Sequence, residues 1–367
     1  MNRKHDRRYT GAMTDLDDPE VYTRFDPSNM IGRIGQLPQQ CSEAWQSIMD
    51  FPLPSDYSAV EKVVILGMGG SAIGGDLVSA LALEEGPPVL VHRDYDLPFV
   101  DEGTLVIASS YSGNTEETLS SFAKALQTPA KKLAITTGGR LKTLAEERGT
   151  PVFCFQYLAE PRAAFGYIFF SLLGLFRKLG LISIESKDID ETIRVLEGLS
   201  TRLDKGAPLN TNQAKQLATK LFGRLVLVYG AGILSKVAFR WKTQINENSK
   251  TSAFYECFPE LDHNAVVGYR FPSWLAEKAF VVMLRSPSLH PRTLIRYKVT
   301  AEILADARMA HEVVEAEGES PLSQIMSAVL LGDYVSYYLA MLNNVDPSPV
   351  AVIDYLKERL GKIEVEC

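Results

Sequence analysis

Cysteine is scarce in this chain, and its four cysteines form no recognisable pair. Cys41, Cys154, Cys257 and Cys367 lie far apart, so the sequence contains neither a Cys-x-x-Cys motif nor a cluster of cysteine and histidine. This spacing argues against a zinc site and against a disulfide framework. We therefore expect reduced thiols, a cytoplasmic protein and no bound metal or other cofactor.

An excess of positive charge is also lacking. Lys and Arg number 38 against 45 for Asp and Glu, which gives a formal net charge of −7. Such a chain lacks the basic surplus that binds nucleic acid or an anionic membrane through bulk charge, so we expect neither as a partner. Any anionic ligand has to be bound by a local arrangement of hydrogen-bond donors.

Long hydrophobic runs are missing as well. The longest, residues 163–176, is shorter than the roughly 20 residues of a transmembrane helix, so we predict a buried or interface helix there. The charged first residues are followed by TDLDDPE instead of an apolar stretch, which argues against a secretory signal. The composition, 46% hydrophobic and 23% charged, is that of a globular protein, and 367 residues favour two domains.

The first half alternates short β-branched runs with segments of helical length, after a leading helix over about residues 28–49. The predicted strands are residues 62–66, 88–92, 104–109, 132–137 and 151–155. Such alternation is typical of a parallel sheet with helices on both faces. Near-continuous apolar strands are what a sheet covered on both faces requires.

The pattern starts again after a charged stretch, residues 183–212, which we predict to be a helix and a loop between two domains. Further strands are expected at 225–230, 279–284 and 311–318, and helices from 235 and over 292–305, 322–343 and 350–360. The sequence thus predicts an α/β protein with two doubly wound parallel sheets. We divide it into residues 1–185 and 186–367.

A glycine-rich turn follows the first predicted strand, in the segment KVVILGMGGSAIGGD. Gly67, Gly69 and Ala72 match the G-x-G-x-x-[GA] pattern of dinucleotide-binding folds, and Asp94 stands where the acid that binds the ribose would lie. The hydroxyl of Ser71 and the backbone N–H groups of the same turn suit a single phosphate or a sugar equally well. This motif alone leaves a dinucleotide and a sugar phosphate open.

A second polar turn, SSYSGNTEET, follows the third predicted strand and favours the phosphate. Ser110, Ser112 and Thr115 place three hydroxyls around Gly113, which lets the backbone approach a ligand. Hydroxyls and free N–H groups at a helix N-terminus bind an anion without a lysine. Ordinary capping of a helix would need only one of these hydroxyls.

Both turns resemble the sugar isomerase (SIS) domain, a flavodoxin-like module that binds phosphosugars, and TTGGRL at 136–141 resembles it too. The resemblance implies that the substrate phosphate is held by Gly70, Ser71, Ser110, Ser112 and Thr115. The module is shared by isomerases, the sugar half of an amidotransferase and regulators that only sense phosphosugars. It therefore indicates the class of ligand and leaves the reaction open.

The second half holds a candidate acid–base pair in QINENSKTSAFYECFPELDHN. Glu247 lies at the end of a predicted helix, and His263 lies in a polar loop. Aldose–ketose isomerisation requires opening of the sugar ring and transfer of a proton between C2 and C1, for which a carboxylate and an imidazole are suitable groups. Taken singly, each residue would more often be an ordinary surface residue.

The motifs N-E-N-x-K and P-E-L-x-H-N in this stretch resemble the bifunctional phosphoglucose/phosphomannose isomerase family, and EPRAAFGY and DPSPVAVIDYLK extend the likeness. The resemblance implies two SIS domains, with Glu247 as the base and His263 as the ring-opening residue. Arg162 would be the cation beside the enediolate, and Lys357 would assist at the ring oxygen. It further implies a homodimer whose active site lies at the subunit interface, with the histidine supplied by the neighbouring chain.

We therefore expect a metal-independent isomerase that interconverts glucose 6-phosphate and mannose 6-phosphate with fructose 6-phosphate through a cis-enediol. Ser348 is our candidate for the residue that makes room for the mannose epimer. A phosphosugar-binding regulator without catalysis is an alternative, but it would have no use for Glu247 and His263. An NAD-linked dehydrogenase would use GMGGSA and Asp94 and would leave the SYSGNT turn without a role.

Overall fold

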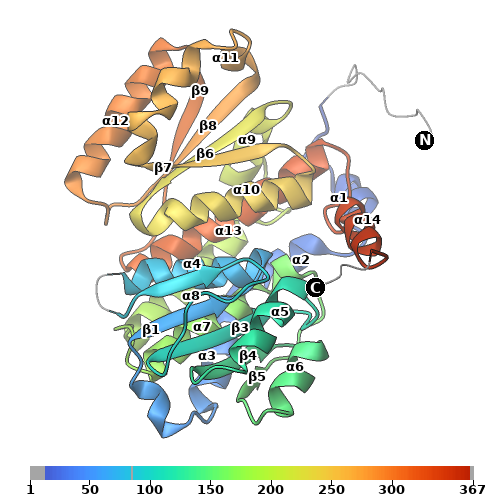
Figure 1. The fold of residues 1–367 in the computed structure, drawn as a ribbon. Helices are drawn as coiled ribbons and strands as arrows, with labels where there is room; N and C mark the ends of the chain where they lie inside the picture. The colour runs from blue at the N-terminus through green and yellow to red at the C-terminus, as the bar shows by residue number, and fades with distance from the viewer. Residues whose placement is uncertain (1–12, 84–85, 364–367) are drawn as a thin grey trace.

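The computed structural model describes residues 13–83 and 86–363, and the strands in this part of the chain form two parallel sheets (Figure 1). The strand order is β2-β1-β3-β4-β5 in the first sheet and β7-β6-β8-β9 in the second. Both orders follow the flavodoxin-like pattern, in which the first strand of each sheet lies between the second and the third. The predicted α/β class with two doubly wound parallel sheets is confirmed. Cys367 and the first ten residues lie outside the described ranges.

The first sheet contains all five strands expected from the sequence. They are β1 (Lys62–Leu66), β2 (Val89–His92), β3 (Thr104–Ser110), β4 (Lys131–Thr136) and β5 (Val152–Cys154). Helices α5 (Glu116–Ala125) and α6 (Gly139–Glu146) pack on one face, and α4 (Gly69–Ala82) and α7 (Phe165–Lys178) pack on the other, with α3 (Leu37–Asp50) against α7. Alternate residues of β1, such as Val63 and Val64, are buried on opposite faces, as a doubly covered sheet requires.

The second sheet contains β6 (Leu225–Ala231), β7 (Ala253–Phe258), β8 (Ala279–Arg285) and β9 (Ala310–Glu315). Its helices are α10 (Ser235–Ser249), α11 (Leu275–Lys278) and α12 (Pro291–Asp306), with α8 (Ser186–Leu203) and α9 (Gln213–Leu221) beside α13 (Pro321–Leu342). The predicted domain boundary at residue 185 falls between α7 and α8 and stays a prediction.

Helices α10 and α13 lie between the two sheets and join the halves of the molecule (Figure 1). Helix α13 is long and apolar enough to cross a membrane by length and composition, yet its apolar window is fully buried inside the protein. It packs against α8, α9 and α10, and one continuous apolar cluster extends from the first sheet through these helices to the second. The two halves therefore share a core.

Three predictions from the sequence need correction. The leading helix over 28–49 is two helices, α2 (Met30–Gly35) and α3, because Pro38 lacks an N–H group and suits the first turn of a new helix. Strand β7 was not predicted, since it is an edge strand whose middle residues are exposed. Helices α1 (Pro19–Phe25) and α9 were also not predicted.

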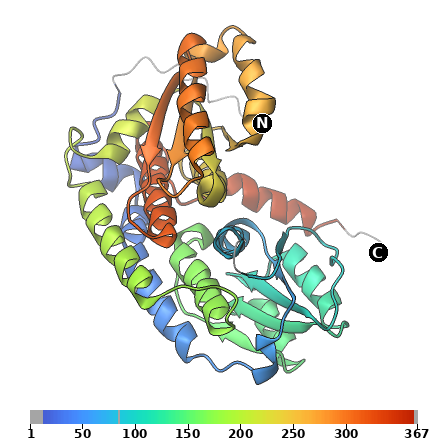
Figure 2. The ribbon, with the colours of Figure 1, turned by 90° about the vertical axis from the view of Figure 1, so that its left-hand side faces the viewer.

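Helix α14 (Ala351–Leu360) forms where it was expected, but it buries none of its residues against the described chain. Figure 2 shows it extending along the side of the molecule toward the C-terminus. It differs in this respect from the other long helices of the fold, which all bury one face or more.

Candidate active site

The glycine-rich turn opens α4 at the carboxyl end of β1. Gly69 has a φ of +51°, a conformation that glycine adopts without strain, and a Cβ at this position would meet no atom within 4 Å. A Cβ at Gly70 would lie 3.6 Å from the carbonyl oxygen of Pro161, so the turn touches the segment that carries Arg162. Ser71 is buried, and its hydroxyl accepts a hydrogen bond from the N–H group of Tyr111 at 3.4 Å.

The hydroxyl-rich turn follows β3, the neighbouring strand on the side where the strand order reverses. In open α/β sheets this reversal creates the crevice in which ligands bind. The hydroxyls of Ser110 and Thr115 are 2.9 Å apart, and the Ser112 hydroxyl accepts a bond from the N–H group of Asn114 at 3.2 Å. Thr115 is the N-cap of α5, but its side chain does not cap the helix. Capping of α5 therefore does not account for the Thr115 hydroxyl.

Arg162 is buried beside these turns, in the short 3₁₀ helix η2 (Pro161–Ala164) that precedes α7. Its Nε donates to Oδ1 of Asn248 at 2.7 Å, and one terminal nitrogen donates to the carbonyl oxygens of Pro347 and Ser348 at 2.6 and 2.8 Å. The side chain thus bonds to the end of α10 and to the loop before α14. Burial lowers the pKa of Arg162, and the carboxylate of Glu247 opposes that shift.

Glu247 projects from the last turn of α10 and forms an ion pair with Arg162, with 3.6 Å between the carboxylate and the other terminal nitrogen. The side chain of Glu247 remains 32% exposed, whereas that of Arg162 is 5% exposed. A carboxylate that solvent can reach thus faces a fixed, buried cation. This pair can remove a proton and stabilise the negative charge that develops on an adjacent oxygen.

Ser348 lies in the same place. Its carbonyl oxygen is bound by Arg162, its N–H group donates to the carboxylate of Asp346 at 2.8 Å, and its hydroxyl is buried without a hydrogen-bond partner. Buried hydroxyls normally find a partner within the protein or in a ligand or water. The hydroxyl of Ser348 thus lies unpaired in the interior, in the residue whose carbonyl oxygen Arg162 binds.

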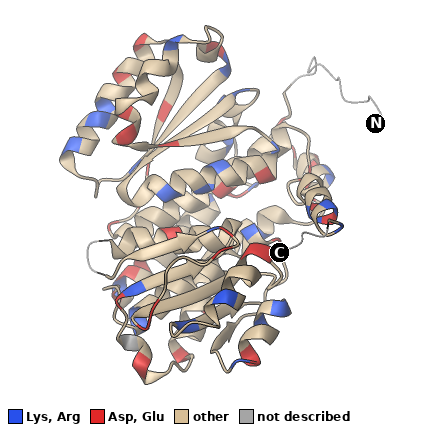
Figure 3. Cartoon of the chain, viewed as in Figure 1, with Lys and Arg blue, Asp and Glu red and all other residues tan. Residues whose placement is uncertain are grey.

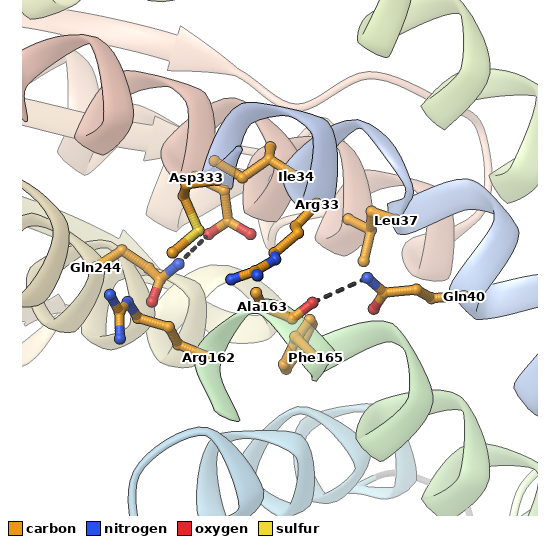
Figure 4. A pocket seen from close by; sticks show the side chains of 10 residues that line it. Arg33, Ile34, Leu37, Gln40, Arg162, Ala163, Phe165, Gln244 and Asp333 are labelled. Atoms are coloured by element: carbon orange, nitrogen blue, oxygen red, sulfur yellow. Dashed lines mark hydrogen bonds between the residues drawn. The ribbon is translucent and has the colours of Figure 1, made fainter. Parts of the chain in front are cut away.

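A second buried network lies next to Arg162, and Figure 4 shows two of its members, Gln244 and Asp333. Arg240 of α10 binds both carboxylate oxygens of Asp333 in α13 at 3.0 and 2.7 Å, and Gln244 donates to one of them at 2.9 Å. Arg240 also donates to the carbonyl oxygen of Arg162 at 3.4 Å and lies over the ring of Phe165. The cavity among these residues is only about 10 Å³, room for about one water molecule, so the network is not the substrate site.

Lys250 is a member of the cluster that the sequence did not single out for a role. It ends α10 in the left-handed region, with a φ of +57°, and its ammonium donates to the carbonyl oxygens of Glu247 and Pro347. Partial burial lowers the pKa of Lys250 to about 8, and the charge of Arg162 adds to the shift, while Asp346 and Glu247 oppose it.

His263 is not brought near Glu247 within one chain. It ends the short 3₁₀ helix η4 (Glu260–His263) and is exposed. Glu247 precedes the amino end of β7, whereas His263 follows its carboxyl end, and six residues of strand span about 20 Å. The two residues therefore lie at opposite ends of β7.

Lys357 is placed with the exposed helix α14 and contacts no residue of the cluster around Arg162 in the described chain. Helix α14 starts three residues after Ser348, so Lys357 is tethered to the cluster without reaching into it. The structure unites Gly70, Ser71, Ser110, Ser112, Thr115, Arg162, Glu247 and Ser348 in one region of a single chain, and it leaves His263 and Lys357 outside.

One of the residues that sequence reasoning missed carried a readable signal. Asp333 is the only charged residue in the apolar segment PLSQIMSAVLLGDYVSYYLAML. A single charge in a buried helix requires a partner, although its identity could not be read from the spacing. Arg240 and Lys250 had no such signal, because both occur among other polar residues of α10 and the loop that follows it.

Comparison with known proteins identifies sequences similar to this chain. Residues 210–360 match the family model described as the bacterial phospho-glucose isomerase C-terminal SIS domain. A bifunctional phosphoglucose/phosphomannose isomerase of Caldicellulosiruptor bescii is 43% identical over 91% of this chain and 100% of its own length. An enzyme of the same name from Aquifex aeolicus is 36% identical over 84% of this chain and 93% of its own.

A solved structure supports the fold alone. The hypothetical protein TT0462 from Thermus thermophilus superposes with a TM-score of 0.69, over 94% of this chain and 93% of its own, at 17% sequence identity. At that identity the likeness extends to the arrangement of sheets and helices and not to the chemistry of a site.

The depressed pKa of Lys250 predicts unusual reactivity toward amine reagents. At pH 8 about half of the Lys250 side chains are neutral, against well below one in a hundred for a lysine with the ordinary pKa of about 10.4. Labelling with acetic anhydride, followed by mass spectrometry, should reach half its maximum near pH 8 at this residue. Lys187, whose pKa is raised by Glu185, serves as the internal control. Identical pH profiles for the two lysines would contradict the prediction.

Proposed function

We propose a reaction scheme for this site from one premise: the chain belongs to the bifunctional phosphoglucose/phosphomannose isomerase family. The protein is an aldose–ketose isomerase that acts on phosphosugars, interconverting glucose 6-phosphate and mannose 6-phosphate with fructose 6-phosphate. The observation that carries the scheme is the exposed carboxylate of Glu247 paired with the buried Arg162, directly beside the Gly70 turn.

The phosphate of the substrate binds to the two turns of the first domain. Gly70 and Ser71 approach it from the start of α4, and Ser110, Ser112 and Thr115 approach it from the loop before α5. Backbone N–H groups at two helix N-termini and several hydroxyls balance a dianion without a lysine. This mode of binding suits a protein whose net charge is −7.

Glu247 then acts as the base on the sugar. It removes the proton from C2 of the open-chain aldose, and the electron pair moves to give a cis-enediolate. Arg162 stabilises the charge on the oxygen while a proton passes from the O2 hydroxyl to O1. Glu247 then returns its proton to C1, and the C2–O2 carbonyl of the ketose forms. Because Arg162 is held by Asn248 and two carbonyl oxygens, it need not reorganise during the reaction.

Ring opening is assigned to His263 and Lys357, and it requires a second chain. Glu247 precedes β7 and His263 follows it, and this separation supports a histidine supplied by a neighbouring subunit. We propose a homodimer with two sites, each combining Glu247 of one subunit with the histidine of the other. Two-fold symmetry makes the two sites equivalent.

Ser348 accounts for the acceptance of both epimers. Glucose and mannose differ at C2 alone, so one enediol serves both if C2 can be presented in two orientations. The small side chain of Ser348, buried without a partner next to Arg162, leaves space at this carbon. A regulator or an NAD-linked dehydrogenase would leave the Arg162–Glu247 pair without a purpose.

We also place the enzyme in the cytoplasm. Within the described ranges Cys41, Cys154 and Cys257 are free thiols, which suits a reducing compartment.

Replacing the base tests the reaction directly. Glu247→Gln keeps the shape of the side chain but cannot accept the proton, so kcat should fall by at least about a thousandfold while the phosphosugar still binds. Coupled assays with each sugar phosphate and calorimetric titration measure the two quantities. Glu146→Gln, at the end of α6, is the control and should stay near wild type. Near-normal turnover by the Glu247 variant would show that another group is the base.

Mixed dimers test the shared site. Glu247→Gln and His263→Ala should each be inactive alone, because each dimer lacks one group in both sites. When the two chains are co-expressed and pair at random, half of the dimers regain one intact site, so activity should return to about a quarter of the wild-type value. No recovery, despite mixed dimers on native mass spectrometry, would mean that one chain supplies both residues.

Enlarging Ser348 tests the basis of epimer acceptance. Ser348→Gln fills the space beside C2, so kcat/KM for mannose 6-phosphate should fall about tenfold more than for glucose 6-phosphate. Ser348→Ala removes only the hydroxyl and should keep the ratio of the two activities. Equal loss on both sugars in the glutamine variant would assign the discrimination elsewhere.

A further inference from the structure

Helix α14 presents an apolar stripe to solvent. Val352, Leu356 and Leu360 recur at intervals of four residues and are 83, 56 and 47% exposed, and Ile353 extends the same face. Residues four apart lie on one side of a helix, so the side chains form a continuous strip. An exposed strip of this kind on an otherwise uncovered helix marks an interaction surface.

A second apolar stripe lies on the outer face of α12. Ile295, Val299 and Ile303 have the same spacing of four residues and are 49, 44 and 36% exposed. They line a groove of about 280 Å³ that extends to Asp262, the residue before His263. Arg296 and Thr300 both bind the carboxylate of Asp262 at 2.9 Å, so the groove and the histidine segment form one rigid unit.

The two stripes have the same length. Their flanking charges are opposite in sign at corresponding ends, so they are complementary when the helices are parallel. Each spans nine residues from first to last, and the eight steps between them cover about 12 Å of helix. Helix α12 is basic near its start, with Arg292, and acidic near its end, with Glu302 and Asp306. Helix α14 has Asp354 near its start and Arg359 in its last turn. Figure 3 shows charges of both signs along the two helices.

Each of the two stripes lies beside one part of the proposed shared site. Helix α14 leaves the cluster around Arg162 only three residues after Ser348, at the rim of the site that needs a histidine from another chain. The groove adjoins that histidine. A second copy of the chain that supplies His263 to this site therefore also brings its α12 groove close to α14.

We propose that α14 of one chain packs, parallel, into the α12 groove of a second copy of this chain, and that the exchange is reciprocal. Leu356 lies against Val299 of the other copy, and Arg359 lies near Glu302. The contact also brings Lys357 of one chain toward His263 of the other, which unites the two residues that lie outside the single-chain cluster. The inference rests on the shared site of the proposed function.

Cysteine crosslinking tests the pairing in the full-length protein. One chain carries Val299→Cys and the other Leu356→Cys, both with Cys154→Ser and Cys367→Ser to remove two other thiols that could crosslink. After co-expression and mild oxidation, a covalent dimer should form between the two kinds of chain, and neither variant alone should give one. Absence of the crosslink, or an internal crosslink in a chain that carries both substitutions, would overturn the proposal, the latter by showing that α14 folds back on its own chain.

The strength of association gives an independent measurement. Leu356→Asp places a charge in the proposed contact, so the dimer dissociation constant should rise at least about a hundredfold in sedimentation equilibrium. Leu83→Asp, at an apolar residue that is 82% exposed at the end of α4, is the matched control. Arg359→Glu and Glu302→Arg should each weaken the dimer by up to about fivefold, and the double variant should restore it. A Leu356 variant that dimerises like the control would refute the contact.

These measurements separate the inference from the proposed function. Recovery of activity in mixed Glu247 and His263 dimers without the crosslink would leave the shared site standing and remove the α14 contact. The crosslink without recovery of activity would establish the contact and show that the histidine does not cross between subunits.

Discussion

The buried guanidinium of Arg162 is the contact on which the arrangement of the site depends. It arises from the first domain, yet its hydrogen bonds end on Asn248 at the end of α10 and on the carbonyl oxygens of Pro347 and Ser348. One side chain therefore links Glu247, the loop before α14 and the edge of the glycine-rich turn. A lysine could not replace it, because a single ammonium lacks the planar set of donors that reaches three acceptors.

Such a cation is costly to bury, and the fold offsets this cost with a second buried pair. Arg240 and Asp333 bind one another through both carboxylate oxygens between α10 and α13. Burial raises the pKa of Asp333, while the positive charges of Arg240 and Arg162 oppose that shift. A buried ion pair is weak evidence for net stability, but loss of either partner leaves an unpaired charge that costs about 3–5 kcal/mol. The pair thus constrains how α10 sits on α13, and with it the position of Glu247.

Most of the fold could be predicted from the sequence because a sheet covered on both faces requires unbroken apolar strands, which are easy to recognise. The exposed edge strand β7 lacks that pattern and was missed. For the site, the motifs identified Arg162 and Glu247, but not the contacts that hold them, since residues 162 and 348 meet only in the folded chain. Burial lowers the pKa of Lys250, and a further part of the shift comes from Arg162, 88 positions away, which spacing along the sequence does not reveal.

The two sheets also explain why the domains have different roles. Each places a left-handed glycine directly after its first strand, Gly69 in one and Gly232 in the other, where flavodoxin-like folds bind ligands. A Cβ at Gly69 would meet open space, whereas at Gly232 it would meet the buried side chain of Leu289 at 2.9 Å. Leucine thus fills in the second domain a position that is open at the glycine-rich turn of the first. In our scheme the second domain instead contributes Glu247 and His263, which lie at opposite ends of β7.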